Sequence, residues 1–224
     1  MNRKLLLTGV ALTTLLLASC GGVDNTGKEN AADDSAKKTS SDNNDSKLVK
    51  SGPLLEIGQY HNAENGEKVT LMGIATPKQN VDMKPITMLI KDVKLLKHEK
   101  VSDSVKEQLT LAYNKEKADI NDPYYTIQVQ FSASNTTDAN VQTNGIESIT
   151  TDTGVQMDLE SGLYDESLGS NLNGKVTKDY SSTGFIGSNG NINSVKIKFG
   201  NIADADSFET LHEASDNIEI KLSK

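Results

Sequence analysis

The feature that most constrains the fold is a strict alternation of apolar and polar side chains in the segment 124–133, YYTIQVQFSA. Successive side chains of a β-strand point to opposite faces, so a period of two is typical of a strand with one face in the core. The segment is therefore predicted to be a half-buried antiparallel strand. Its core face would carry Tyr125, Ile127, Val129, Phe131 and Ala133, and its other face Thr126, Gln128, Gln130 and Ser132.

The same alternation recurs elsewhere in the chain. The segments 194–200 and 217–223 repeat it with the apolar positions Val195, Ile197, Phe199, Ile218, Ile220 and Leu222. Weaker strand candidates are 67–75, 145–150, 155–159 and 180–187. The chain has no Trp, so its core is expected to consist mainly of Ile, Val and Leu. These segments together predict a mainly β domain of antiparallel strands.

The run ITMLIKDVKLLK, residues 86–97, changes phase in its middle. Ile86, Met88 and Ile90 share one parity, whereas Val93 and Leu95 share the other. A straight strand would expose one of these two sets to water. We therefore expect either a β-bulge or a crossing from one sheet of a sandwich to the other within this run.

Four Asn-Gly pairs lie between the strand candidates, and this dipeptide tolerates the positive φ angles that type I′ hairpin turns require. They are predicted to form hairpin turns at Asn65-Gly66, Asn144-Gly145, Asn173-Gly174 and Asn189-Gly190, with generic loops as the alternative. Asp152-Thr153-Gly154 is predicted to be a further tight connection.

One segment, 101–117, has helical rather than strand spacing, with apolar residues at Val105, Leu109, Ala112 and Tyr113. Ser104 and Glu107 match a capping box, in which each side chain satisfies a free backbone N–H at the start of a helix. Asp122-Pro123 then ends the helical region. The sequence predicts one helix lying over the sandwich between two long strands.

The N-terminus has the features of a secretory signal. A short cationic start is followed by an apolar run of about 13 residues, which as a helix spans roughly 20 Å and is too short to cross a bilayer. The run ends in Leu17-Ala18-Ser19-Cys20, and Cys20 is the only cysteine of the chain. This resembles the lipobox of bacterial lipoproteins, in which the Cys thiol is acylated and the signal is cut just before it. The resemblance implies cleavage between Ser19 and Cys20 and lipidation of Cys20; the alternative is a chance Cys at the end of an ordinary signal peptide.

Residues 21–52 contain Gly, Ser, Asn, Asp and Lys with almost no large apolar side chain. Such a composition cannot bury enough surface to offset the entropy lost on ordering. We therefore predict a flexible tether, with a specific recognition tail as the alternative. The expected organisation is a signal peptide at 1–19, the lipidated Cys and linker at 20–52, and one folded domain at 53–224.

The residues with catalytic or metal-binding potential show no convergent pattern. His61, His98 and His212 each stand alone in polar surroundings, without a second ligand at metal-binding spacing, and are predicted to be surface histidines. Asp204, Asp206 and Glu209 loosely resemble a Ca²⁺ loop but lack its central Gly and ligand spacing. An exposed acidic turn, beginning a short helix, is the preferred interpretation. The sequence thus predicts no catalytic residues, no metal site and no cofactor.

The net charge of −8 and the lack of aromatic stacking platforms among the scattered lysines argue against nucleic acid as a partner. Removal of residues 1–19 would make the chain more acidic still, since it takes away Arg3 and Lys4 and no acid. The expected partners are the membrane, through the N-terminal lipid, and an envelope or host protein or polymer.

Six features taken together resemble those of small lipoproteins of low-GC Gram-positive bacteria that carry an immunoglobulin-like domain of unknown function. They are the lipobox, the tether and the strings ITMLIKDVKLLK, DPYYTIQVQFSASNTTDANV, TTDTG and NIEIKLS. That domain is similar to the mycobacterial secreted antigen with an immunoglobulin-like sandwich. The resemblance covers residues 86–222 and is carried by Tyr125 to Phe131, Ser134 to Thr137 and Asp152 to Gly154. It implies an immunoglobulin-like antiparallel β-sandwich with one inserted helix, and no catalytic residues to carry over.

These observations lead to one expected function with two alternatives. We expect a non-enzymatic binding module, lipid-anchored at the extracellular face of the cell membrane of a Gram-positive bacterium, that binds through an exposed edge strand or through loops at one end of the sandwich. The alternatives are a solute-binding receptor for an importer and an envelope hydrolase that uses scattered Asp and Glu residues.

Overall fold

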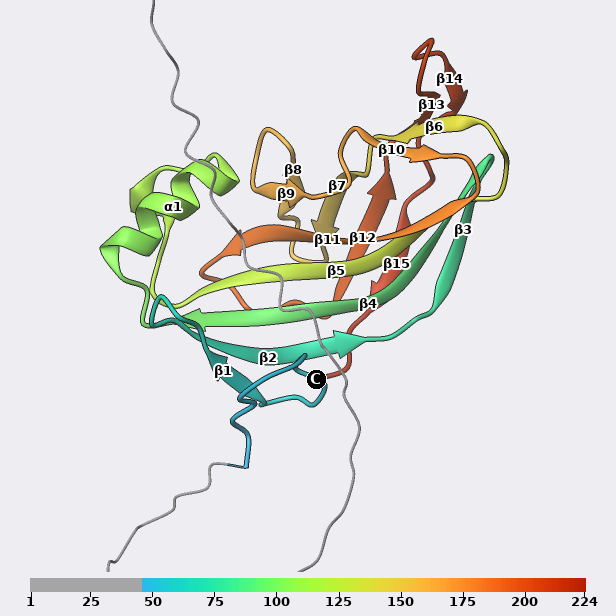
Figure 1. Ribbon diagram of the computed structural model, residues 1–224. Coiled ribbons are helices and arrows are strands. Elements are labelled where there is room, and N and C mark those ends of the chain that lie inside the picture. The colour runs from blue at the N-terminus through green and yellow to red at the C-terminus, as the bar shows by residue number, and fades with distance from the viewer. Residues whose placement is uncertain (1–45) are drawn as a thin grey trace, which may run out of the picture. The chain divides into compact units, whose positions relative to one another are not determined.

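The computed structural model describes residues 46–224. In this part of the chain, antiparallel strands form three sheets that enclose a common core, with one α-helix between two of the long strands (Figure 1). The prediction of a mainly β, antiparallel sandwich with one inserted helix is confirmed.

The largest sheet contains the long strands of the molecule. Its order is β1-β2-β4-β5-β11-β9, and β3 pairs with the remaining half of β4. All of its pairings are antiparallel, and β4 and β5 run side by side over most of their length. The strands are β1 (Tyr60–Asn62), β2 (Lys68–Ala75), β3 (Gln79–Met83), β4 (Ile86–Glu99), β5 (Tyr124–Asn135), β9 (Leu163–Asp165) and β11 (Val176–Gly187).

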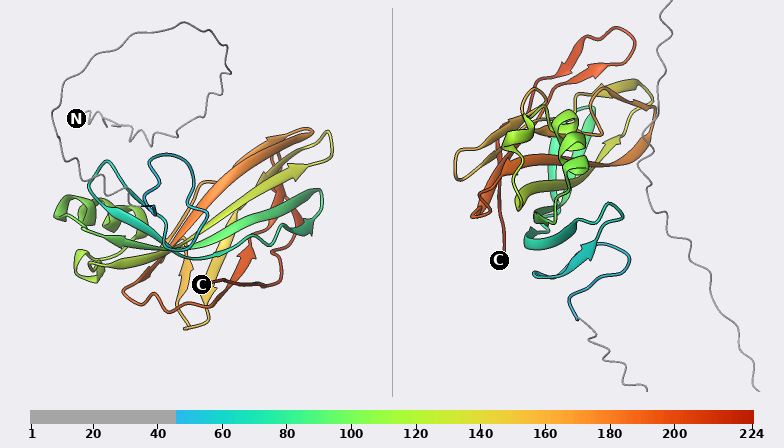
Figure 2. Two further views of the ribbon diagram at one scale, coloured as in Figure 1. Left: turned by 90° about the horizontal axis from the view of Figure 1, so that it is seen from below. Right: turned by 90° about the vertical axis from the view of Figure 1, so that its left-hand side faces the viewer.

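Two smaller sheets cover the inner face of the large sheet (Figure 2). One has the order β10-β6-β13-β14 and the other β15-β12-β7-β8. Their strands are β6 (Asn140–Thr143), β7 (Ile146–Thr151), β8 (Gln156–Asp158), β10 (Ser170–Asn173), β12 (Ser194–Phe199), β13 (Ile202–Asp204), β14 (Thr210–His212) and β15 (Ile218–Lys221).

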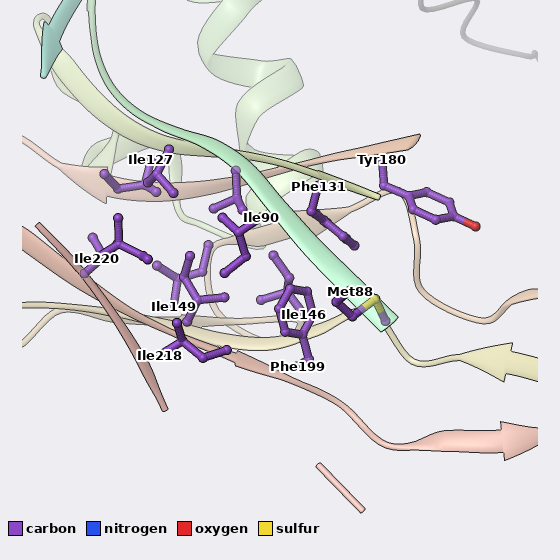
Figure 3. Packing of buried hydrophobic residues seen from close by; sticks show 14 of the residues in the cluster. Met88, Ile90, Ile127, Phe131, Ile146, Ile149, Tyr180, Phe199, Ile218 and Ile220 are labelled. Atoms are coloured by element: carbon purple, nitrogen blue, oxygen red, sulfur yellow. The ribbon is translucent and has the colours of Figure 1, made fainter. Parts of the chain in front are cut away.

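The main core lies between the large sheet and the two smaller ones. Ile90 and Phe131 of the large sheet pack toward Ile149 and Phe199 of the smaller sheet opposite (Figure 3). The rings of Phe131 and Phe199 meet edge to face, with centroids 5.2 Å apart. The inward positions predicted from the alternation in 124–133, 194–200 and 217–223 pack in or against this core, so those predictions are confirmed.

The phase change in 86–97 is a β-bulge within the single strand β4. Ile90 pairs with Phe131, and the next pairing joins Asp92 to Gln130, which leaves Lys91 as the extra residue. Because the bulge shifts the parity by one, Met88 and Ile90 before it and Val93 and Leu95 after it all reach the core.

The outer face of the large sheet is partly covered, at two places. Helix α1 (Asp103–Tyr113) contributes Val105 to a cluster with Tyr124 and Phe185. The N-terminal segment 47–54 covers the other place, where Leu54 packs against Leu96 and neighbouring residues of β2. Thr126 and Ser132, on the predicted solvent face of β5, are buried as well.

The helix is present where predicted, but its boundaries differ. Ser102, not Ser104, is the N-cap: its Oγ accepts the backbone N–H of Val105 at 3.3 Å. The helix ends at Tyr113, because Asn114 takes a left-handed conformation with φ +49°. Ala112, predicted to face the sandwich, is exposed.

The Asn-Gly pairs do not form type I′ hairpins, because none of their Asn residues has a positive φ. Asn65-Gly66 lies in the β1–β2 hairpin, whereas the other three pairs connect strands of different sheets. Asp152-Thr153-Gly154 does form a tight hairpin between β7 and β8, closed by the N–H of Gly154 bonding the carbonyl of Thr151 at 3.0 Å.

Candidate functional site

A polar groove of about 410 Å³ lies on the outer face of the large sheet, beside the N-terminal segment that covers β2 and β4. Strands β4 and β5 form its floor, and residues 52–54 form one wall. It is lined by Gly52, Pro53, Leu54, His61, Lys91, Asp92, Lys94, Leu96, Gln128 and Gln130.

The bulge in β4 is the local feature that builds this floor. After the bulge, Asp92 and Lys94 have the parity of the outer face, and they pair in register with Gln130 and Gln128 of β5. Two charged and two amide side chains are thereby placed side by side on neighbouring strands.

The charged pair on the floor is only partly satisfied. The Lys94 side chain is 7% exposed, and its Nζ lies 3.4 Å from Asp92 Oδ1. That same carboxylate oxygen is buried and has no hydrogen-bond partner among residues 46–224. A buried charge that lacks its full set of hydrogen bonds is costly, and such groups are normally completed by water or a ligand. The floor therefore offers an ammonium donor and a carboxylate acceptor next to each other.

Ion pairs and hydrogen bonds hold the groove rim in place. Lys91 Nζ lies 2.6 Å from Asp179 Oδ1 on β11, which ties the bulge to the strand beyond β5. Gln130 Nε2 donates to Ser181 Oγ at 3.1 Å, again toward β11. These contacts occupy Lys91 and Gln130, which leaves Asp92, Lys94 and Gln128 as the remaining charged and amide residues of the floor.

A buried polar cluster adjoins the groove on the same face of the sheet. The rings of His98 on β4 and Tyr124 on β5 stack with centroids 4.3 Å apart. Tyr124 donates its hydroxyl to Glu67 Oε1 at 2.9 Å, and His98 Nε2 shares a hydrogen bond of 3.0 Å with Thr126 Oγ1. Asn65 Nδ2 donates to the other Glu67 oxygen at 2.7 Å. This cluster joins the turn between β1 and β2 to β4 and β5 through side chains.

The surroundings of the cluster shift its titration. Burial, with a smaller contribution from the neighbouring His61, lowers the pKa of His98 to about 4. Burial also lowers the pKa of His61. Burial and the nearby Glu67 carboxylate raise the pKa of Tyr124 well above its usual range, so its hydroxyl acts as a donor at neutral pH.

The prediction of three isolated surface histidines is wrong for His98, whose side chain is only 14% exposed. His61 pairs with Val69, and Val69 pairs with His98, so β1, β2 and β4 bring the two histidines to one face. His212 lies apart from them on β14, where its Nδ1 contacts the Glu213 carbonyl. Sequence spacing could not show this, because the pairing of β1 with β2 and of β2 with β4 decides it.

A second depression of about 600 Å³ is larger but offers less chemistry. Glu147, Asp158, Glu160 and Glu213 line it, together with two partly exposed leucines. Glu147 already pairs with Lys198 at 2.7 Å, and the buried polar atoms without a partner among residues 46–224 lie elsewhere. The groove over β4 and β5 is therefore the better candidate.

The remaining predicted site residues fall into two groups. Leu17, Ala18, Ser19 and Cys20 lie outside the described residues. Asp204, Asp206 and Glu209 lie at the turn between β13 and β14, which confirms the exposed acidic turn but shows no helix there. Within residues 46–224, no three His, Cys, Asp or Glu side chains are arranged to hold a metal ion, and no helix is long and apolar enough to cross a bilayer.

Sequence reasoning missed Asp92, Lys94, Glu67 and Tyr124 as members of a site. A usable signal was present for two of them: once the phase change at 90–93 is interpreted as a bulge, Asp92 and Lys94 must share the face opposite the core. The sequence predicted a helix over the sandwich, but no signal in it indicated that residues 47–54 would also cover part of this second face.

The chain matches no protein-family model and no curated protein. It is similar to one solved structure, described as the crystal structure of a functionally unknown protein from Listeria monocytogenes EGD-e. The two share 17% identity with a TM-score of 0.43, over 68% of this chain and 86% of the other.

Proposed function

We propose that this protein is a lipid-anchored binding module at the outer face of a bacterial cell membrane, and that the groove over β4 and β5 is its binding site. The predicted lipidation of Cys20 and the predicted tether supply the location. The observation that carries the binding role is the partly satisfied pair of Asp92 and Lys94 on the groove floor. It acts by binding, because this pair presents hydrogen-bonding groups without a nucleophile and an activating base in contact.

The floor defines the chemistry of the ligand. Lys94 provides an ammonium that favours an acceptor such as a carbonyl, carboxylate or hydroxyl oxygen. The Asp92 carboxylate, whose side chain is 23% exposed, favours an N–H or O–H donor of the same ligand. A segment of a wall polymer, in which amides and hydroxyls alternate at short spacing, carries both. The polar floor, with Leu54 and Leu96 at one side, suits such a segment better than an apolar one.

A solute-binding receptor is the second candidate, because a groove of about 410 Å³ falls within the range of small-molecule sites. The two candidates share the site and differ in the ligand: a polymer fragment in the first, a free solute in the second.

The test measures binding of soluble wall fragments, and of a panel of free amino acids and sugars, to the chain without its lipid. We expect wall fragments to bind and the Lys94→Met variant to weaken that binding at least tenfold. Lys196→Met, which replaces an exposed lysine on β12, is the matched control and should bind normally. Unchanged affinity in the Lys94 variant would exclude the groove, and binding of a free solute alone would favour the receptor.

A further inference from the structure

The hairpin of β13 and β14 carries a strained and exposed aromatic side chain at its turn. Phe208 is 68% exposed and has a φ of +61°, in the left-handed region. This conformation is unfavourable by about 1–2 kcal/mol for a residue with a Cβ atom, and Gly or Asn is the usual occupant. The hairpin projects beyond the body of the sandwich in two perpendicular views (Figures 1 and 2).

The turn is preorganised by its own hydrogen bonds. Asp204 Oδ1 accepts the N–H groups of Asp206 and Ser207 at 3.0 and 2.8 Å and the Ser207 hydroxyl at 3.1 Å. The N–H of Phe208 bonds the Asp204 carbonyl at 3.0 Å, and the N–H of Asp204 bonds the Glu209 carbonyl at 2.9 Å. The backbone hydrogen bonds of Ser207 and Asp206 also lower the pKa of Asp204. Phe208 is thus displayed on a fixed loop.

The side chain of Phe208 lies outside the buried clusters formed by residues 46–224. Neighbouring Leu211 is exposed as well, at 45%. A single exposed apolar residue is ordinary, but an exposed aromatic residue in a strained conformation reduces stability without an internal gain. Such strain at a preorganised loop is a mark of function.

The charge around the hairpin defines the partner. The hairpin itself carries the acids Asp204, Asp206 and Glu209, Glu213 follows it directly, and the segment 199–220 contains no Lys or Arg. Such a surface is repelled by anionic lipids and by nucleic acids, whereas it attracts a basic protein surface.

We propose that the β13–β14 hairpin docks onto a partner protein, with Phe208 and Leu211 entering an apolar pocket that is rimmed by Lys and Arg. Aromatic side chains buried at the centre of an interface contribute a large share of the binding energy. The fixed loop lowers the entropy lost on binding. The surrounding carboxylates raise the association rate and select a basic rim. This site is separate from the groove and independent of its ligand.

The first experiment tests the strain with the Phe208→Gly variant. Glycine fits the left-handed backbone, so we expect the variant to melt about 2–4 °C above the original chain. Leu111→Ala is the matched control: it removes another apolar side chain, 88% exposed on α1, from a position without positive φ, and its effect should be smaller. A lower melting temperature for Phe208→Gly would overturn the premise that the left-handed conformation of Phe208 destabilises the domain.

The second experiment locates the partner. A photo-crosslinking amino acid is placed at position 208, and in a control at position 111, of the full chain in intact cells. The protein captured at 208 is identified, purified and titrated against the original chain, Phe208→Gly and Lys94→Met at two salt concentrations. We expect a loss of at least tenfold in affinity for Phe208→Gly, weaker binding at higher salt, and unchanged binding for Lys94→Met.

Three outcomes would overturn the proposal. The first is that no protein is crosslinked at position 208 beyond those captured at position 111. The second is a captured protein whose affinity is the same for the original chain and Phe208→Gly. The third is binding of the original chain, but not of Phe208→Gly, to vesicles of phosphatidylglycerol and phosphatidylcholine, which would assign the hairpin to a lipid surface.

Discussion

The buried histidine beside the groove makes stability depend on pH in a direction that can be stated in advance. The pKa of His98 is lowered from 6.5 to about 4, chiefly by burial. Between these two values the unfolded chain binds a proton at this residue and the folded chain does not. Acid therefore favours the unfolded state, and stability should rise as the pH increases through this window.

The size of the effect follows from the two pKa values. One pH unit corresponds to about 1.4 kcal/mol, so the interval from 6.5 to about 4 represents about 3 kcal/mol in total. At pH 5, which lies inside this interval, the free energy of unfolding is about 2 kcal/mol lower than at pH 7.5 because of His98. Below pH 4 both states are protonated at His98, and this contribution stops growing.

The assay is urea unfolding at several pH values between 5 and 7.5, for the original chain and for His98→Gln. Glutamine fills part of the same space and can still hydrogen-bond Thr126, but it does not titrate. Between pH 7.5 and pH 5, the free energy of unfolding of the variant should fall by about 2 kcal/mol less than that of the original chain. The His212→Gln variant controls for a histidine outside the buried cluster and should follow the original chain.

The opposite sign would refute this reasoning. His98 Nδ1 lies 3.8 Å from Glu67 Oε1, so a protonated His98 would gain an ion pair inside the domain. If that attraction outweighed burial, the original chain would gain stability relative to His98→Gln as the pH falls. Equal slopes for the two proteins would show that His98 titrates alike in the folded and unfolded states.

Four further changes test other parts of the structure. Cys20→Ala should abolish labelling with radioactive fatty acid and leave the melting temperature of the folded domain unchanged. Asp165→Ala should destabilise the domain by about 2–4 kcal/mol in urea unfolding. The reason is that the carboxylate accepts hydrogen bonds from Ser167 Oγ, from the buried Ser182 Oγ and from the N–H of Ile146. A loss of stability below 1 kcal/mol would contradict this. Gly145→Ala should cost about 2 kcal/mol or more by the same assay, because φ is +66° and a Cβ would meet the Asp165 carboxylate. The Asp92→Leu/Lys94→Met double variant should keep or raise the melting temperature while losing wall-fragment binding, since an apolar pair does not need the missing hydrogen bonds; retained binding would exclude the groove.

The local pattern of the sequence determined the long strands and their core faces, and it limited the break in 86–97 to a bulge or a crossing. Alternation with a period of two is set by strand geometry alone, so Ile127, Val195 and Ile220 could be assigned to the core without knowledge of their partners. The phase change in 86–97 required a bulge or a crossing for the same reason. The helix near 101–117 was also predictable, although its cap was not, because Ser102 and Ser104 are equally good capping residues by sequence.

The candidate site was decided by tertiary structure. Glu67, His98 and Tyr124 are far apart along the chain, and only the pairing of β2 with β4 and of β4 with β5 brings them into contact. The partial burial of Asp92 and Lys94 likewise depends on the covered outer face of the sheet. The strained conformation of Phe208 arises from the closure of one particular hairpin. The face on which a side chain lies is a property of its own strand. The burial, pKa and backbone strain of a residue depend instead on the segments that pack against it, and the local sequence does not specify those segments.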